Sequence, residues 1–176
     1  VENAIKYAVT PREEGADIRA HLLNHLCDSF KGTVFRQTMF AEFERDLHRW
    51  EEAGTPLTAE FLCAQYYDLN KKYYGSGFAA HPAIGHEWCR IPHFYYDFYV
   101  YKYATGFSSA IMLSKTILSF EKRSLDAYFE FLRAGDSKDV LDIMTDAGVD
   151  LRSPKPVHAA LEHFENVVGR LEDLTL

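Results

Sequence analysis

The segment IPHFYYDFYVYKYATG, residues 91–106, holds five of the eleven tyrosines of the chain. Placed on a helix at 100° per residue, it presents His93, Tyr96, Tyr99, Val100 and Tyr103 within an arc of about 120°. Each buried phenol needs a hydrogen-bond partner, so a face with one imidazole and three phenols suits a polar ligand. A Tyr-rich helix with its hydroxyls at the edge of the core is the open alternative. The other side of the helix is predicted to be ordinary core: Phe94, Phe98 and Tyr101, with Tyr95 as a further packing residue.

Composition places the chain among globular proteins. Its 176 residues fit one domain, and a content of 47% hydrophobic and 15% aromatic residues argues against disorder. The net charge of −7 is dispersed and leaves no basic stripe, which argues against a nucleic-acid partner. No run of about 20 apolar residues occurs, so we expect no membrane span.

The cysteines and the first residues indicate the setting of the protein. Cys27, Cys63 and Cys89 are odd in number and form no CxxC pair, which is typical of reduced thiols in a cytoplasmic protein. No signal peptide is visible. The chain opens on Val1, and ENAIKYAV resembles the middle or end of a helix. We therefore expect a piece of a longer protein.

Helical periodicity dominates the first half of the chain. Residues 10–13, TPRE, form a capping box that predicts a helix start. The apolar period continues to about Trp50, with Gly32 either kinking one helix or separating two. Thr58 is suited to cap a helix that runs to about Tyr74. Residues 76–91 have no clear period and are predicted to be a long loop that leads into the segment 91–106.

The second half predicts further helices and no strand. A buried small-residue helix follows Gly106, and another spans about 125–133. Ser137 is suited to cap a short helix, and Pro156 to open a last one that ends near Leu174. The fold prediction is therefore all-α, with about seven or eight helices, forming a single helical unit over residues 1–176.

Two histidine groups have spacings that allow metal binding, and both have plainer explanations. His21 and His25 lie one helical turn apart, but no third ligand is near in sequence. His81, His86 and His93 could meet around a metal, yet loop histidines more often form hydrogen bonds. We predict no metal ligands in this chain.

Three stretches closely resemble the oligoendopeptidase F family, which belongs with thimet-oligopeptidase-like zinc peptidases. The matches are EWCRIPHFYYDFYVYKYATG at 87–106, GTVFRQTMFAEFE at 32–44 and AGVDLRSPKPVHAALEHFE at 147–165. The resemblance covers essentially the whole chain. It implies the C-terminal part of a mostly helical catalytic domain, built around a deep cleft, that cleaves short peptides.

The same resemblance implies a zinc site that this sequence lacks. In the family, a His-Glu-x-x-His helix supplies two zinc ligands and the general base, and a later Glu supplies the third ligand. No His-Glu-x-x-His occurs in this chain. The resemblance places Val1 shortly after the third ligand, so zinc is expected in the full-length protein, held by its missing N-terminal part.

The family resemblance also implies roles for the His/Tyr face. The matching histidine and tyrosines line the cleft opposite zinc and resemble donors to the developing oxyanion. His93, Tyr99 and Tyr103 are accordingly the predicted catalytic residues, and Tyr96 is a predicted substrate contact. The alternative function is a non-catalytic helical module that binds peptides or proteins through this face. Without the zinc helices an apolar surface should be exposed, so self-association of the chain is expected.

Overall fold

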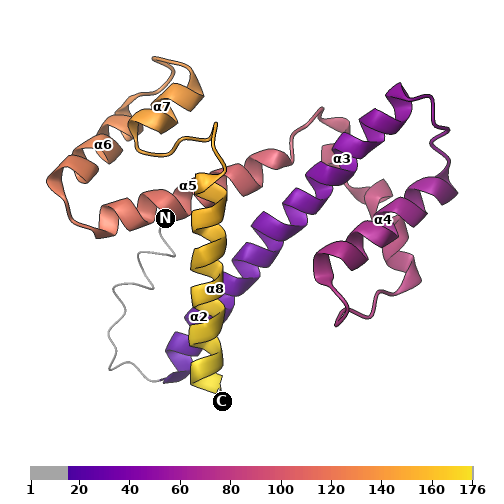
Figure 1. The fold of residues 1–176 in the computed structure, drawn as a ribbon, viewed down its shortest axis with the longest axis horizontal. Coiled ribbons are helices and arrows are strands. Elements are labelled where there is room, and N and C mark those ends of the chain that lie inside the picture. The colour runs from indigo at the N-terminus through magenta and orange to yellow at the C-terminus, as the bar shows by residue number, and fades with distance from the viewer. Residues whose placement is uncertain (1–15, 176) are drawn as a thin grey trace. The chain divides into compact units, whose positions relative to one another are not determined.

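The computed structural model describes residues 16–175 (Figure 1). Within that range the chain forms seven α-helices, α2 to α8, together with one π-helical turn, two 3-10 helices and no strand, which confirms the all-α prediction. The capping box at residues 10–13 lies outside the described residues. No helix in the described part is both long and apolar enough to cross a membrane.

The described residues fall into two compact units. One contains residues 32–104, and the other contains residues 16–31 together with 105–175. The chain passes between them at Gly32, within the π-helical turn, and again after Ala104 in α5 (Tyr101–Leu118). That the whole chain belongs to one catalytic domain stays a prediction.

The periodic segment around Gly32 forms two α-helices separated by a wider turn. α2 (Ala16–Phe30) ends where the π-helical turn η1 (Lys31–Phe35) begins, and α3 (Arg36–Glu52) follows it directly. A π-turn accommodates one additional residue in the helical path, so the segment divides without a loop. Gly54, with φ of 73°, follows the end of α3, where glycine adopts the left-handed conformation readily.

The unit 32–104 is built on two neighbouring helices, α3 and α4 (Ala59–Tyr74) (Figure 1). Thr58 caps α4 as predicted, because its hydroxyl accepts a hydrogen bond from the Phe61 N–H at 3.2 Å. Phe43 packs at the centre, with the Tyr66 ring 5.0 Å away and the Phe94 ring 5.6 Å away. The core between the helices comprises Met39, Phe40, Phe43, Leu62, Tyr66, Ile91 and Val100.

Residues 76–100 differ from the prediction in two respects. The predicted loop contains a 3-10 helix, η2 (Pro82–Arg90), and the predicted helix over 91–106 is wrong before Tyr101. A short 3-10 helix, η3 (Pro92–Tyr95), is followed by a bend at 96–98. Asp97 and Phe98 have φ of 50° and 56°, and these left-handed conformations interrupt the helix before α5 begins.

The second unit places α8 (Lys155–Thr175) along α2 (Figure 1). Phe30 joins these helices to α5, because its ring lies 5.0 Å from the Phe164 ring and 4.9 Å from the Phe107 ring. α6 (Lys122–Arg133) and α7 (Val140–Asp146) complete the unit. The cap prediction for α7 is wrong: Asp139, not Ser137, accepts a hydrogen bond from the Leu141 N–H, at 2.9 Å.

Candidate active site

The structure brings His93, Tyr96, Tyr99 and Tyr103 together in one group, the His/Tyr cluster. The His93 and Tyr99 rings are stacked, with centroids 5.4 Å apart and planes at 10°. The Tyr96 ring makes an edge contact with each, and its centroid lies 6.0 Å from that of His93 and 6.2 Å from that of Tyr99. Tyr103, on α5, also makes edge contacts, with its ring centroid 6.1 Å from that of His93 and 5.5 Å from that of Tyr99. The four polar residues of the predicted face therefore lie together, although the predicted continuous helix is wrong.

The cluster is open enough for its polar groups to meet a ligand. Tyr96 is 61% exposed, and the other three members are half-buried. Val100, which the helical projection placed on the same face, is instead fully buried in the core. Partial exposure of phenols and an imidazole is what a surface for a polar ligand requires.

The polar atoms of the cluster are suited to donate hydrogen bonds. The Tyr103 hydroxyl donates to the Tyr99 hydroxyl at 3.4 Å. This hydrogen bond, followed by burial and the charge of the neighbouring phenol, raises the pKa of Tyr103. The Lys102 ammonium lies 5.2 Å from the Tyr99 ring centroid, in the range of a cation–π contact.

The neighbouring aromatic residues are not the packing residues that the sequence predicted. Tyr95 is 78% exposed, Phe98 is 41% exposed and Tyr101 is 49% exposed. Of the predicted core side, only Phe94 packs against the core cluster. The bend at 96–98 changes the direction of these side chains, so a projection on one helix assigns them to the wrong side.

Two side chains of α3 contact the bend. The Phe98 N–H donates to Glu44 Oε1 at 2.8 Å, and the His48 ring lies 4.4 Å from the Phe98 ring. Left-handed backbone costs about 1–2 kcal/mol for each residue that is not glycine, so these contacts offset a real strain. Sequence reasoning missed Glu44, although a signal was present: it shares the core-facing helical period of Phe40 and Leu47.

A second buried carboxylate, Glu87, fixes η2 immediately before the cluster. It forms ion pairs with Arg36 at 2.6 Å and Arg90 at 2.7 Å, and it accepts the Tyr66 hydroxyl at 2.9 Å. Burial by itself raises the pKa of Glu87, but the hydrogen bonds from Arg36 and Tyr66 outweigh burial and lower the pKa. Burial and the bond to Glu87 raise the pKa of Tyr66.

Glu87 was also missed as a structural residue. His86-Glu87 begins like a His-Glu-x-x-His motif, but position 90 is Arg, and this local sequence does not indicate an ion-pair network. Its partners Arg36 and Tyr66 lie 51 and 21 positions away, so no local pattern identifies them. The network ties η2 to both α3 and α4, and η2 leads directly to Pro92 and His93.

The side chains in the described part of the chain do not form a zinc site by themselves. No group of three or more His, Cys, Asp or Glu side chains within residues 16–175 could hold a metal ion. His21 and His25 are exposed on α2, and the His81 Nδ1 accepts a hydrogen bond from the Ala83 N–H at 3.2 Å.

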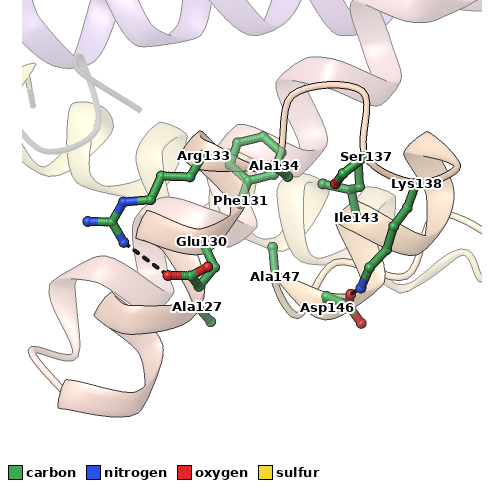
Figure 2. A pocket seen from close by; sticks show the side chains of 10 residues that line it. All are labelled: Ala127, Glu130, Phe131, Arg133, Ala134, Ser137, Lys138, Ile143, Asp146 and Ala147. Carbon is green, nitrogen blue, oxygen red and sulfur yellow. Dashed lines mark hydrogen bonds and ion pairs between the residues drawn. The ribbon is translucent and has the colours of Figure 1, made fainter.

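The hollow between α6 and α7 lies in the other unit and contains none of the predicted site residues. Figure 2 shows Phe131, Ile143 and Ala147 among its lining residues. Two ion pairs border it: Glu130 with Arg133 at 3.0 Å, and Lys138 with Asp146 at 2.6 Å. These charges pair with one another and supply no unpartnered group for catalysis.

Comparison with known proteins gives consistent matches. Residues 2–163 match the model of peptidase family M3. Oligopeptidase PepF of Bacillus subtilis is 51% identical over 90% of this chain and 24% of its own length. The plasmid oligoendopeptidase F of Lactococcus lactis subsp. cremoris is 43% identical over 98% of this chain and 29% of its own. The match thus spans 24–29% of the length of these two relatives.

The solved structures extend the similarity to three dimensions. The crystal structure of oligoendopeptidase-F from Enterococcus faecium matches with a TM-score of 0.90 and 47% identity, over 93% of this chain and 32% of that one. A putative peptidase from Chlamydophila abortus matches with a TM-score of 0.87 and 34% identity, over 98% of this chain and 28% of that one. The helical arrangement is therefore shared with proteins about three times as long.

Proposed function

The chain belongs to peptidase family M3, with oligoendopeptidases of the PepF type among its relatives, and on this premise we propose that it is the substrate-binding part of a cytoplasmic oligoendopeptidase. The full-length protein hydrolyses short peptides. His93, Tyr99 and Tyr103 donate hydrogen bonds to the reacting carbonyl oxygen, and Tyr96 contacts the substrate.

The His/Tyr cluster is the observation that carries this proposal. Four side chains with polar hydrogens converge on one another while remaining half-buried or exposed. A core does not require such an arrangement, and strained backbone at Asp97 and Phe98 accompanies it. Strain of this kind concentrates at functional sites.

The chemistry of peptide hydrolysis explains why such donors are needed. When water adds to the scissile carbonyl carbon, negative charge develops on the carbonyl oxygen. Phenol O–H and imidazole N–H groups that are already positioned stabilise this charge more than they stabilise the uncharged substrate. Removing one donor of this type typically lowers kcat by about 10²–10³. Tyr103 is suited to this role because it lies within hydroxyl contact of Tyr99 and a phenol carries its proton at neutral pH.

Zinc is proposed to be supplied by residues outside this chain. The side chains within residues 16–175 form no metal group, and the sequence has no His-Glu-x-x-His. The proposal therefore assigns to this chain substrate binding and oxyanion stabilisation only. The remainder of the same protein is its partner in catalysis.

One observation favours a second function. The His/Tyr cluster is open enough to contact a peptide by itself, so the second candidate is a non-catalytic module that binds peptides through this cluster. Upstream zinc-binding helices in the same polypeptide would distinguish the peptidase from this module.

We also propose that the isolated chain self-associates. Large apolar side chains such as Tyr95, Phe120, Leu132 and Val140 are between 58% and 78% exposed. Sedimentation of the isolated chain across a concentration series tests this, and a strict monomer at high concentration contradicts it.

The experiment that tests the proposed function compares this chain with the full-length protein. Zinc content is measured by mass spectrometry, and cleavage of a quenched short peptide is measured by fluorescence. We expect stoichiometric zinc and cleavage from the full-length protein alone. A full-length protein that binds the peptide without cleaving it would favour the non-catalytic module.

A further inference from the structure

Glu44 holds the backbone that separates the two halves of the His/Tyr cluster. It lies on α3 with only 1% of its surface exposed, and its Oε1 accepts the Phe98 N–H at 2.8 Å. One helical turn later, the His48 ring lies 4.4 Å from the Phe98 ring. Helix α3 therefore contacts both the backbone N–H and the ring of Phe98.

The carboxylate of Glu44 is buried, so it needs hydrogen-bond donors from the protein. A carboxylate without water is costly unless donors satisfy it. Within residues 16–175, the hydrogen-bond donor that the structure gives to Glu44 is the Phe98 amide. Asp97 and Phe98 are consecutive left-handed residues, and a phenylalanine rarely adopts that conformation without an external constraint. The Phe98 amide thus gives the buried carboxylate a donor, and the carboxylate stabilises the strained turn.

The position of this turn connects it to the chemistry. His93 and Tyr96 precede it, whereas Tyr99 and Tyr103 follow it. The stack of His93 on Tyr99 requires the chain to change direction between them. An unconstrained segment would lose that change of direction and separate the two predicted donors.

We propose that Glu44 is a positioning residue for the His/Tyr cluster. By accepting the Phe98 amide it fixes the bend, and the bend places Tyr99 against His93. Glu44 does not touch substrate in this proposal. The inference rests on the proposed function for its catalytic consequence, but the structural part stands independently.

The test uses two variants of Glu44 in the full-length peptidase. Glu44→Gln keeps an acceptor oxygen for the Phe98 amide, and Glu44→Met fills the same space without one. Glu42→Met is the matched control: Glu42 lies on the same helix and binds Lys72 at 2.6 Å and Tyr73 at 2.7 Å. Glu42→Met removes hydrogen bonds of a comparable kind from the same helix, but none of them involves the bend at 96–98.

Two readouts are measured for each variant. Amide hydrogen exchange of the peptides that cover residues 94–100 reports the bend directly. Steady-state kinetics with a short peptide separates kcat from KM. We expect Glu44→Met to accelerate exchange in this segment and to lower kcat by about ten- to a hundredfold, with a smaller change in KM. Glu44→Gln and Glu42→Met should retain most of kcat and normal exchange at 94–100.

Either readout can overturn the proposal. Unchanged exchange in Glu44→Met means that Glu44 does not hold the bend, whatever the activity. Faster exchange with unchanged kcat means that the bend does not position the donors. An equal loss of kcat in Glu44→Gln and Glu44→Met would also contradict it. If the unmodified full-length protein cleaves no peptide, the proposed function fails, while exchange still decides whether Glu44 holds the bend.

Discussion

The imidazole of His93 lies parallel to the phenol ring of Tyr99, with centroids 5.4 Å apart and planes at 10°. The stack orients both rings, so their polar atoms are held in a fixed relation to each other. Tyr103 adds an edge contact to each ring and a hydroxyl bond to Tyr99 at 3.4 Å. Preorganised donors stabilise developing charge without reorganisation during the reaction.

Tyr99→Phe is expected to remove a donor while preserving the stack on His93. In the full-length peptidase, kcat for a short peptide should fall by about 10²–10³, with KM little changed. Tyr103→Phe should behave similarly. Tyr95→Phe is the control because Tyr95 is 78% exposed beside the cluster and belongs to no ring contact of it. Equal activity of Tyr99→Phe and Tyr95→Phe would reject the oxyanion role.

Tyr96 is expected to affect binding more than turnover. It is the most exposed member of the cluster, at 61%, and its ring is suited to contact a peptide. Tyr96→Ala should raise KM by about ten- to a hundredfold, since a buried aromatic contact contributes about 1.5–3 kcal/mol. Initial rates over a range of peptide concentrations measure this. A fall in kcat at constant KM would instead place Tyr96 among the donors.

The sequence predicted the grouping of the cluster for a local reason. His93 lies in η3 and Tyr96 directly after it, three positions apart, which is the spacing of a 3-10 turn. Tyr103 lies in α5, and Tyr99 lies two residues before that helix begins, four positions from Tyr103, which is the spacing of one α-helical turn. Each pair therefore lies close together in the structure, although the predicted helix is interrupted between Tyr96 and Tyr99. Caps such as Thr58 were predictable in the same way, because the side chain binds an N–H three residues later.

The interruption of that helix could not be predicted, because its cause is distant in sequence. No glycine or proline lies between His93 and Tyr103 to signal a break. The bend depends on Glu44, which is 54 positions from Phe98. Local periodicity contains no information about such a contact. For the same reason the sequence assigned Phe98 and Tyr101 to the core, although both are exposed.

Gly85 and Gly106 should respond to alanine in opposite directions. A Cβ at Gly85 would lie 2.8 Å from the backbone oxygen of Cys63, so Gly85→Ala must push η2 away from α4. We expect a loss of about 1–3 kcal/mol in the free energy of unfolding. A Cβ at Gly106 would meet nothing within 4 Å, and the residue lies inside α5. Gly106→Ala should raise the free energy of unfolding by about 0.5–1 kcal/mol.

Denaturation of the two variants beside the unmodified chain measures this difference. The backbone oxygen at Cys63 cannot move aside as a flexible side chain can, so the Gly85 effect does not depend on repacking. If Gly85→Ala were as stable as Gly106→Ala, η2 would not rest on α4 as closely as the structure has it.

Glu87→Gln is expected to lower stability in a pH-dependent way. The pKa of Glu87 is lowered in the folded chain, because the bonds from Arg36 and Tyr66 outweigh burial. Above the unfolded pKa of about 4.3 its charge therefore contributes its full stabilisation, and this contribution is lost as the pH falls through the lowered folded pKa. At pH 7 the variant should lose about 1–3 kcal/mol. Denaturation at pH 7, 5 and 3 measures the difference.

The difference between Glu87→Gln and the unmodified chain should shrink as the pH falls, because protonation of Glu87 removes the negative charge that the glutamine lacks. Glu130→Gln provides the control: Glu130 pairs with Arg133 at 3.0 Å, but its side chain is 76% exposed. Exposed pairs contribute about 0–1 kcal/mol, so this variant should differ little at any pH. A Glu87 effect that is constant from pH 7 to pH 3 would show that packing, and not the charge of this carboxylate, holds η2 in place.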